Sequence, residues 1–322
     1  MKPPVLGHLT PFTKLIFLVL LILSCGIIFI LGGIFLVIPL FHVNLMNDPA
    51  VLTDYQNPDA VTILKFLQVL QSAGIFIIPA FLAGFFFNRD APGYLGMRKG
   101  SNIWTIIIVV TIMCVSIPVI NWLASVNEMM SLPASLHGIE EWMKDTEDQA
   151  GKLTDAFLDT YTIGGFLVNL VMIAIIPALG EELVFRGVLQ RLFTEWFRNA
   201  HVAILVCAFI FAAIHLQFYG FLPRFILGLL FGYFFYWTGS LWIPIFCHFL
   251  NNGAAVVASF LNDRGVINTG YQDFGSTNNV HIICGSFIIT VILLFLFYRT
   301  SRPAFITNKI QNTGKNSHFG ET

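Results

Sequence analysis

The stretch from Leu15 to Phe41 is continuously apolar and contains no charged side chain. A helix needs about 20 such residues to cross the hydrocarbon core of a bilayer. The run is too long for the apolar core of a signal peptide, which has roughly 7–15 residues. It therefore predicts a first membrane-spanning helix that is not cleaved.

Seven further apolar runs follow the first one along the chain. Together the eight runs cover approximately residues 15–41, 63–87, 103–124, 163–189, 201–218, 222–238, 240–261 and 281–298. The whole sequence is 56% hydrophobic and 11% charged, whereas soluble domains carry about 25% charged residues. We therefore expect an all-α, polytopic membrane protein with about eight transmembrane helices.

The placement of basic residues predicts the orientation of these spans. Cytoplasmic loops carry an excess of Lys and Arg. If the N-terminus is cytoplasmic, the cytoplasmic segments hold Lys2, Lys14, Arg89, Arg98, Lys99, Arg191, Arg198, Arg299, Arg302, Lys309 and Lys315, which are 11 of the 17 basic residues. Both termini are then cytoplasmic, and the acidic segment 125–161 lies outside with amphipathic helical pieces at the interface.

Composition also indicates the compartment and the partners. The net charge of −1 gives no basic surface for nucleic acid. Because the sequence has no eukaryotic targeting or retention signal, we expect a bacterial cytoplasmic membrane. The polar tail after Tyr298 is predicted to be disordered.

Ionisable side chains within three of the predicted spans are the strongest functional signal. Each costs about 2.5–3.5 kcal/mol on insertion scales and marks a functional site by default. They are Glu181, Glu182 and Arg186 in the fourth span, His215 in the fifth, and His248 with Asn251 and Asn252 in the seventh.

Spacing and depth bring these residues together. Glu182 and Arg186 are four residues apart and share a helix face, as do His248 and Asn252. If the fourth and fifth spans form a hairpin, Glu182 and His215 both lie about 24–26 Å from its tip at 1.5 Å per residue. We therefore expect a polar cavity within the bundle, entered from the cytoplasm, beside a helix that Pro177 bends.

Such a cavity can support two kinds of chemistry. A carboxylate and a neutral imidazole can activate a water molecule, while a second imidazole and a carboxamide can bind an oxyanion. Alternatively, Glu181, His215 and His248 could bind zinc, for which two histidines and a glutamate are a familiar ligand set. The sequence contains no HExxH motif, so the catalytic cluster is the stronger prediction and a zinc cofactor the weaker one.

Three motifs in order resemble a known family. GEELVFRG fits EExxxR, FAAIH fits FxxxH and HFLNN fits HxxxN. This arrangement is similar to the CAAX-protease and bacteriocin-processing family (CPBP, or ABI) of intramembrane glutamic endopeptidases, which includes the type II CAAX prenyl endopeptidases. The resemblance implies that Glu181 and His215 activate water and that His248 and Asn252 bind the oxyanion. It also implies supporting roles for Glu182 and Arg186.

The resemblance divides the chain into three parts. Residues 1–162 form three N-terminal spans and the outer loop, 163–261 form a catalytic core of four spans, and 262–322 form a loop, the last span and the tail. The implied partner is a membrane-associated peptide or protein substrate in the lipid bilayer. Two alternatives are a non-catalytic immunity or scaffold protein and a proton-coupled transporter that uses the intramembrane Glu and His residues.

Overall fold

The computed structural model describes residues 4–316, with side chains as far as Ser301. The described residues form helices and no strand. The helices are α1 (Pro11–Phe41), α2 (Pro58–Ser72), α3 (Ile78–Asn88), α4 (Ala91–Leu95), α5 (Ile103–Glu128), α6 (His137–Leu158), α7 (Ile163–Asn169), α8 (Ile176–Glu182), α9 (Gln190–Phe197), α10 (Ala200–Ala213), α11 (Phe221–Thr238), α12 (Trp242–Asp263) and α13 (Val280–Asn316). The expected all-α membrane fold is confirmed.

Seven helical stretches of the described chain are long and apolar enough to cross a membrane. Two of them join several helices: Pro58–Asn88 runs from α2 through α3, and Ile163–Phe197 runs from α7 through α9. The eighth predicted span corresponds to α10, which has only 14 residues. At 1.5 Å per residue α10 is about 21 Å long, which is shorter than the hydrocarbon core of a typical bilayer.

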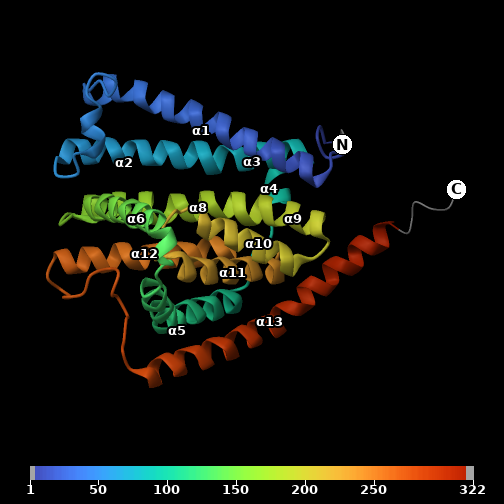
Figure 1. Cartoon of the computed structure of the whole chain (residues 1–322). Coiled ribbons are helices and arrows are strands. Elements are labelled where there is room, and N and C mark those ends of the chain that lie inside the picture. The colour runs from blue at the N-terminus through green and yellow to red at the C-terminus, as the bar shows by residue number, and fades with distance from the viewer. Residues whose placement is uncertain (1–3, 317–322) are drawn as a thin grey trace.

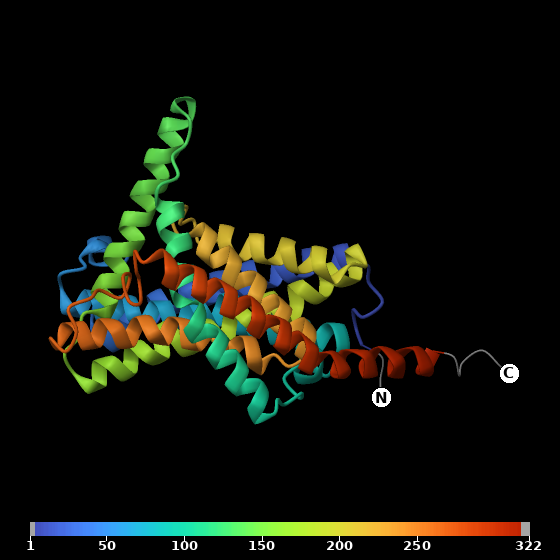
Figure 2. The same cartoon turned by 90° about the horizontal axis from the view of Figure 1, so that it is seen from below.

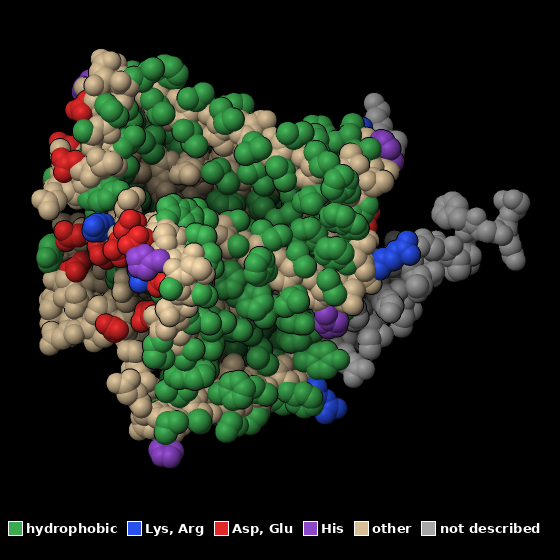
Figure 3. Space-filling view, in the orientation of Figure 1, with side chains coloured by type: hydrophobic (Ala, Val, Ile, Leu, Met, Phe, Trp, Pro, Cys, Tyr) green, Lys and Arg blue, Asp and Glu red, His purple; other side chains and the backbone are tan. Residues whose placement is uncertain are grey.

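The long helices lie side by side, with the start of α1 and the end of α13 at the same end of the bundle (Figure 1). Apolar side chains cover the middle of the molecule, and acidic side chains gather at the end opposite the two termini (Figure 3). Many large apolar residues of α1 and α13 are exposed. This distribution is that of an integral, multi-pass membrane protein, whose lipid-facing surface is apolar.

Two of the long helices contain a π-helical segment just before a proline. The segments are Ala73–Ile77 and Leu170–Ile175, and each overlaps the first isoleucine of the sequence IIPA, whose prolines are Pro79 and Pro177. Proline has no N–H to donate to the carbonyl four residues earlier. Widening of the helix before the proline accommodates this loss. A third π-helical segment, Leu183–Leu189, directly follows the two glutamates.

Helix α6 projects sideways from the bundle and crosses the ends of α10 and α11 (Figure 2). Glu147 of α6 accepts a hydrogen bond from the Tyr219 backbone N–H at 2.9 Å, and Glu140 accepts one from the Tyr219 hydroxyl at 3.2 Å. A hydrogen bond from Lys144 is the main cause of the lowered pKa of Glu140. The predicted outer segment of short helical pieces is therefore mainly one helix of 22 residues, held against the α10–α11 turn.

The prediction of a disordered tail after Tyr298 is wrong within the described residues. Helix α13 continues to Asn316. The tail contains Ala, Lys and Gln, which favour helix, and the polar composition that suggested disorder does not prevent the helix from continuing. The remaining part of the predicted tail, 317–322, lies outside the described residues.

Two glycines of α11 let this helix approach α10 closely. A Cβ at Gly228 would lie 3.1 Å from the Ala208 Cβ, and one at Gly232 would lie 2.8 Å from the Ile204 Cγ2. Small residues at helix interfaces allow this kind of backbone approach in membranes. The α10–α11 hairpin therefore depends on glycine at both positions.

Replacing Gly232 with valine is expected to destabilise the protein by about 1–3 kcal/mol, because the larger side chain overpacks the interface. Thermal unfolding in detergent would measure the loss. Gly285→Val is the matched control, since a Cβ at Gly285 meets nothing within 4 Å. Equal stability of the two variants would contradict this account of the hairpin.

Candidate active site

A cavity of about 280 Å³ lies within the bundle, between α8, α10, α11 and α12 and under α6. It is lined by Thr154, Ile173, Glu181, Phe211, His215, Arg224, Leu227, Phe231, His248, Asn251, Asn252 and Ala255. All four predicted catalytic residues, which are Glu181, His215, His248 and Asn252, are in this lining. As expected from the sequence, the fourth, fifth and seventh predicted spans therefore meet at one cavity.

Glu182 and Arg186 form a fully buried ion pair behind the cavity. The Glu182 Oε1 accepts a hydrogen bond from the Arg186 Nη1 at 2.9 Å, and the two side chains are 0% and 1% exposed. The Arg186 Nη2 donates to the Gly228 carbonyl at 2.9 Å. Its guanidinium carbon also lies 4.9 Å from the centre of the Phe211 ring and 5.6 Å from that of Phe231. The predicted i,i+4 pair is thus built into a cage of aromatic rings.

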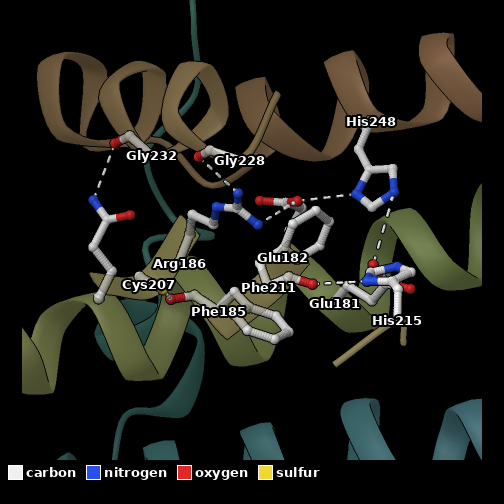
Figure 4. Close-up of polar contacts among 11 residues, drawn as sticks. Glu181, Glu182, Phe185, Arg186, Cys207, Phe211, His215, Gly228, Gly232 and His248 are labelled. Carbon is white, nitrogen blue, oxygen red and sulfur yellow. Dashed lines mark hydrogen bonds and ion pairs between the residues drawn. The ribbon is translucent and has the colours of Figure 1, made fainter. Parts of the chain in front are cut away.

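The same Glu182 oxygen also holds His248 (Figure 4). The His248 Nδ1 lies 2.9 Å from the Glu182 Oε1. The same oxygen already accepts from Arg186, so the Glu182 carboxylate is the acceptor here and the His248 Nδ1 is the donor. The other ring nitrogen, Nε2, lies 3.9 Å from the Glu181 Oε2. Glu182 therefore positions His248, a link that spacing within one helix could not predict.

Glu181 lies on the cavity side of the same helix. Its Oε2 is buried and has no hydrogen-bond partner among the described residues. Adjacent residues of a helix point in directions about 100° apart, which separates the two glutamates into different environments. The Glu182 Oε1 accepts from Arg186 and contacts His248 behind the cavity, whereas Glu181 belongs to the cavity lining.

His215 lies two residues beyond the end of α10, and the backbone sets its protonation pattern. The His215 Nδ1 lies 2.7 Å from the Phe211 carbonyl oxygen. Since a carbonyl only accepts, Nδ1 carries the proton, and Nε2 of the neutral ring has a free lone pair. The Phe211 ring also packs edge-on against His215 at 5.1 Å between centroids. In the FxxxH motif, the backbone carbonyl of the Phe thus orients the imidazole of the His four residues later.

Asn252 takes the place of the backbone donor that Pro177 lacks. In a regular helix the N–H of residue 177 would bond to the Ile173 carbonyl, and proline has no N–H. The Asn252 Nδ2 donates to this carbonyl at 3.1 Å, and the Asn251 Nδ2 donates to the Asn252 Oδ1 at 3.2 Å. These two bonds fix the orientation of the Asn252 amide, whose second N–H is available to the cavity.

Thr154 and Arg224 line the cavity although sequence reasoning assigned them no role. Thr154 belongs to α6, in the acidic segment predicted to lie outside, so the lining extends toward that end of the bundle. None of the lining residues comes from the end of the bundle at which α1 begins, and entry from the cytoplasm stays a prediction. One feature of the sequence could have pointed to Arg224. It is a basic residue at the predicted outer end of a span, and this placement opposes the positive-inside pattern.

A larger apolar pocket of about 630 Å³ adjoins the cavity and shares Leu227, Asn251 and Ala255 with it. Its other walls come mainly from α5 and α12, with Phe166 and Leu170 on the side of α7. The two spaces together offer an apolar compartment next to a polar one. This is the combination that a substrate with an apolar segment and a peptide bond requires.

The residues considered for zinc do not form a metal site. Within the described part of the chain, no group of three or more His, Cys, Asp or Glu side chains could hold a metal ion. The side chains of Glu181, His215 and His248 are therefore not grouped as a zinc site in the described part of the chain, and the chemistry below is assigned to these side chains and a water molecule.

Comparison with known proteins gives one family and one relative. Residues 163–254 match the family described as type II CAAX prenyl endopeptidase, Rce1-like. An uncharacterized protein of Bacillus subtilis (strain 168), YpbD, is 30% identical over 86 residues, which are 26% of this chain and 41% of YpbD. The chain thus matches less than half the length of that relative, and no solved structure matches it. The segment that matches the Rce1-like family, 163–254, contains every residue of the predicted catalytic cluster.

Proposed function

We propose that this protein is an intramembrane endopeptidase that hydrolyses a peptide bond in a membrane-associated peptide or protein. One observation carries the proposal. A carboxylate without a hydrogen-bond partner among the described residues, two oriented imidazoles and an oriented carboxamide line a single cavity within the bundle. The match of this segment to a family of endopeptidases supports the same reaction class.

In the proposed mechanism, Glu181 and His215 activate a water molecule. The Glu181 Oε2 and the His215 Nε2 are the free acceptors of the cavity. One of them takes a proton from water as the oxygen bonds to the carbonyl carbon of the substrate. The C–N bond then breaks, and the same proton is returned to the departing amine nitrogen.

His248 and Asn252 are proposed to stabilise the oxyanion of the tetrahedral intermediate. With Nδ1 bonded to ionised Glu182, a second proton on the His248 Nε2 makes this nitrogen a charged donor that faces the cavity. The second N–H of Asn252 is the other donor. Preorganised donors of this kind contribute roughly 10²–10³-fold each to the rate.

Glu182 and Arg186 are proposed to act through His248. From the sequence, we expected this pair to support Glu181. The hydrogen bonds instead connect Glu182 to His248 and Arg186 to Gly228. The pair therefore sets the orientation and charge of the oxyanion donor, while Glu181 remains free for water.

The apolar pocket beside the cavity is proposed to bind the apolar part of the substrate. Its volume of about 630 Å³ is within the range of pockets that hold molecules of drug size. A chain of apolar side chains or a lipid group would fit its lining. The family description names prenylated substrates, and a prenyl group has the chemistry that this pocket accepts.

We propose the topology and domain organisation that the sequence predicts together with this function. Residues 163–261 are proposed to be the catalytic core, with 1–162 and 262–322 as the flanking parts. Both termini are proposed to be cytoplasmic, in a bacterial cytoplasmic membrane, with α6 on the other side.

The purified protein in detergent is expected to hydrolyse membrane-derived peptides at a rate that chelators do not change, because water activation is assigned to Glu181 and His215. Mass spectrometry of the products and elemental analysis of the protein would measure both properties. A rate that falls on chelation and returns with zinc would contradict the metal-free mechanism. Comparison of protein N-termini in membranes with active and Glu181→Ala protein would identify the substrates.

Two other outcomes would replace the proposal. Binding of a membrane protein without any cleavage would indicate an immunity or scaffold protein. Ion flux in proteoliposomes that disappears in Glu181→Gln protein, with no peptidase activity in the wild type, would indicate a proton-coupled transporter.

A further inference from the structure

Arg224 is the charged residue of the cavity that the proposed chemistry does not use. The described lining contains four ionisable side chains, which are those of Glu181, His215, His248 and Arg224. The first three act on water or on the oxyanion. Arg224 lies in the first turn of α11 and is the one permanent cation among the described lining residues.

One arm of the Arg224 guanidinium has no hydrogen-bond partner among the described residues. Its Nη2 donates to the Gln217 Oε1, while its Nη1 is buried and has no hydrogen-bond partner among the described residues. The group lies over Gly220, where a Cβ would overlap it. Glycine at this position thus leaves the space that the guanidinium occupies. The Gln217 contact holds one arm of the fork, and the other arm can bind a molecule in the cavity.

The surrounding carboxylates do not neutralise this arginine by direct contact. Glu147 and Glu181 are the acidic groups that act on its charge, yet no ion pair within 4.0 Å joins either of them to Arg224 in the described structure. The Glu147 Oε2 is bonded to the Tyr219 N–H. Arg186, by contrast, has its carboxylate at 2.9 Å. Arg224 is half-buried, and a carboxylate is the best complement of a guanidinium that has no bonded anion.

We propose that Arg224 binds a carboxylate of the substrate peptide and thereby orients the peptide in the cavity and sets a preference for anionic substrates. The inference rests on the proposed peptidase function. The carboxylate is either the C-terminal one of the peptide or an Asp or Glu side chain close to the cleaved bond. Both present two oxygens in the plane that a guanidinium recognises.

The test compares matched peptides on the wild type and on Arg224→Gln. One pair differs in a C-terminal acid or amide, and the other in an internal Asp or Asn. Wild-type protein is expected to prefer one carboxylate peptide by roughly 10–100-fold in kcat/KM, as for a charge-assisted hydrogen bond. In Arg224→Gln this ratio should fall to about 1, mainly through KM. The pair that shows the preference identifies which carboxylate is bound.

Further variants separate binding from a structural role. Arg224→Lys keeps the charge and should keep part of the ratio, and Gly220→Ala should lower it by displacing the guanidinium. Arg191→Gln is the control, because this arginine packs on Tyr94 and Phe235 outside the cavity and its loss should not change the ratio. Equal losses on acid and amide peptides, or a ratio that survives in Arg224→Gln, would overturn the proposal.

A binding measurement distinguishes failure of this inference from failure of the peptidase assignment. Labelled acid and amide peptides are titrated into Glu181→Gln protein and into the Glu181→Gln/Arg224→Gln double variant. Tighter binding of the acid peptide to the first protein alone supports the carboxylate site even if the wild type cleaves nothing. Equal affinities in both proteins contradict the carboxylate site even if the wild type is an active peptidase.

Discussion

Glu181→Gln protein is expected to hydrolyse peptides about 10²–10⁴-fold more slowly than the wild type, the usual contribution of a general base. Glutamine has nearly the same shape but cannot take a proton from water. The Glu181 Oε2 has no hydrogen-bond partner among the described residues, so the substitution breaks no hydrogen bond there and removes only the charge that faces the His248 Nε2 at 3.9 Å. Single-turnover assays in detergent would measure the rate, and thermal unfolding would show that the fold is retained.

Glu195→Gln is the matched control for this substitution. Glu195 lies in α9, half-exposed and 3.3 Å from the Lys14 Nζ, far from the cavity lining. The substitution keeps the shape of the side chain and removes a carboxylate that is not in the cavity lining, so the rate of this variant should stay close to the wild-type rate. Turnover by Glu181→Gln at the wild-type rate would remove Glu181 from the mechanism.

Arg186→Met is expected to destabilise the protein by about 3–5 kcal/mol, because it leaves the Glu182 carboxylate buried without its cation. Both side chains are at most 1% exposed, so water cannot replace the arginine. The Gly228 carbonyl also loses its donor. The shift in thermal unfolding, followed by the loss of helical signal in detergent, would measure the effect.

The double variant Glu182→Gln/Arg186→Met tests whether the unpaired Glu182 charge causes the loss of stability. It removes both charges and should be more stable than Arg186→Met alone. It should still hydrolyse peptides poorly, because His248 loses the carboxylate that orients it. Arg98→Met is the control, since the Arg98–Asp90 pair is exposed and should contribute about 0–1 kcal/mol. A fully stable Arg186→Met protein would contradict the role of this ion pair.

The sequence predicts well those features that depend on one helix at a time. Apolar runs locate the spans, and i,i+4 spacing predicts the Glu182–Arg186 pair. Depth along the predicted hairpin places Glu182 level with His215, and the structure has Glu181 and His215 in one cavity. Each of these predictions needs only the rise per residue and the number of residues per turn.

The remaining features depend on how the helices are rotated against one another, which spacing does not determine. The His248–Glu182 bond and the Asn252–Ile173 bond both join α12 to the helix of the glutamates. The sequence showed Pro177 as a bend, but not which side chain would satisfy the carbonyl that it leaves free. The position of α6 over the cavity follows from tertiary contacts with Tyr219, which no local pattern encodes.

The short α10 has a consequence for the surrounding lipid. Its 14 residues span about 21 Å, whereas the hydrocarbon core of a bilayer is about 30 Å thick. A membrane adjusts to such hydrophobic mismatch by thinning locally or by admitting polar groups beside the short helix. We therefore expect the bilayer to be thinnest next to α10, where His215 follows the end of the helix. If the protein is the proposed peptidase, water and a partly unwound substrate helix would meet the lowest barrier to the interior of the membrane at this side of the bundle.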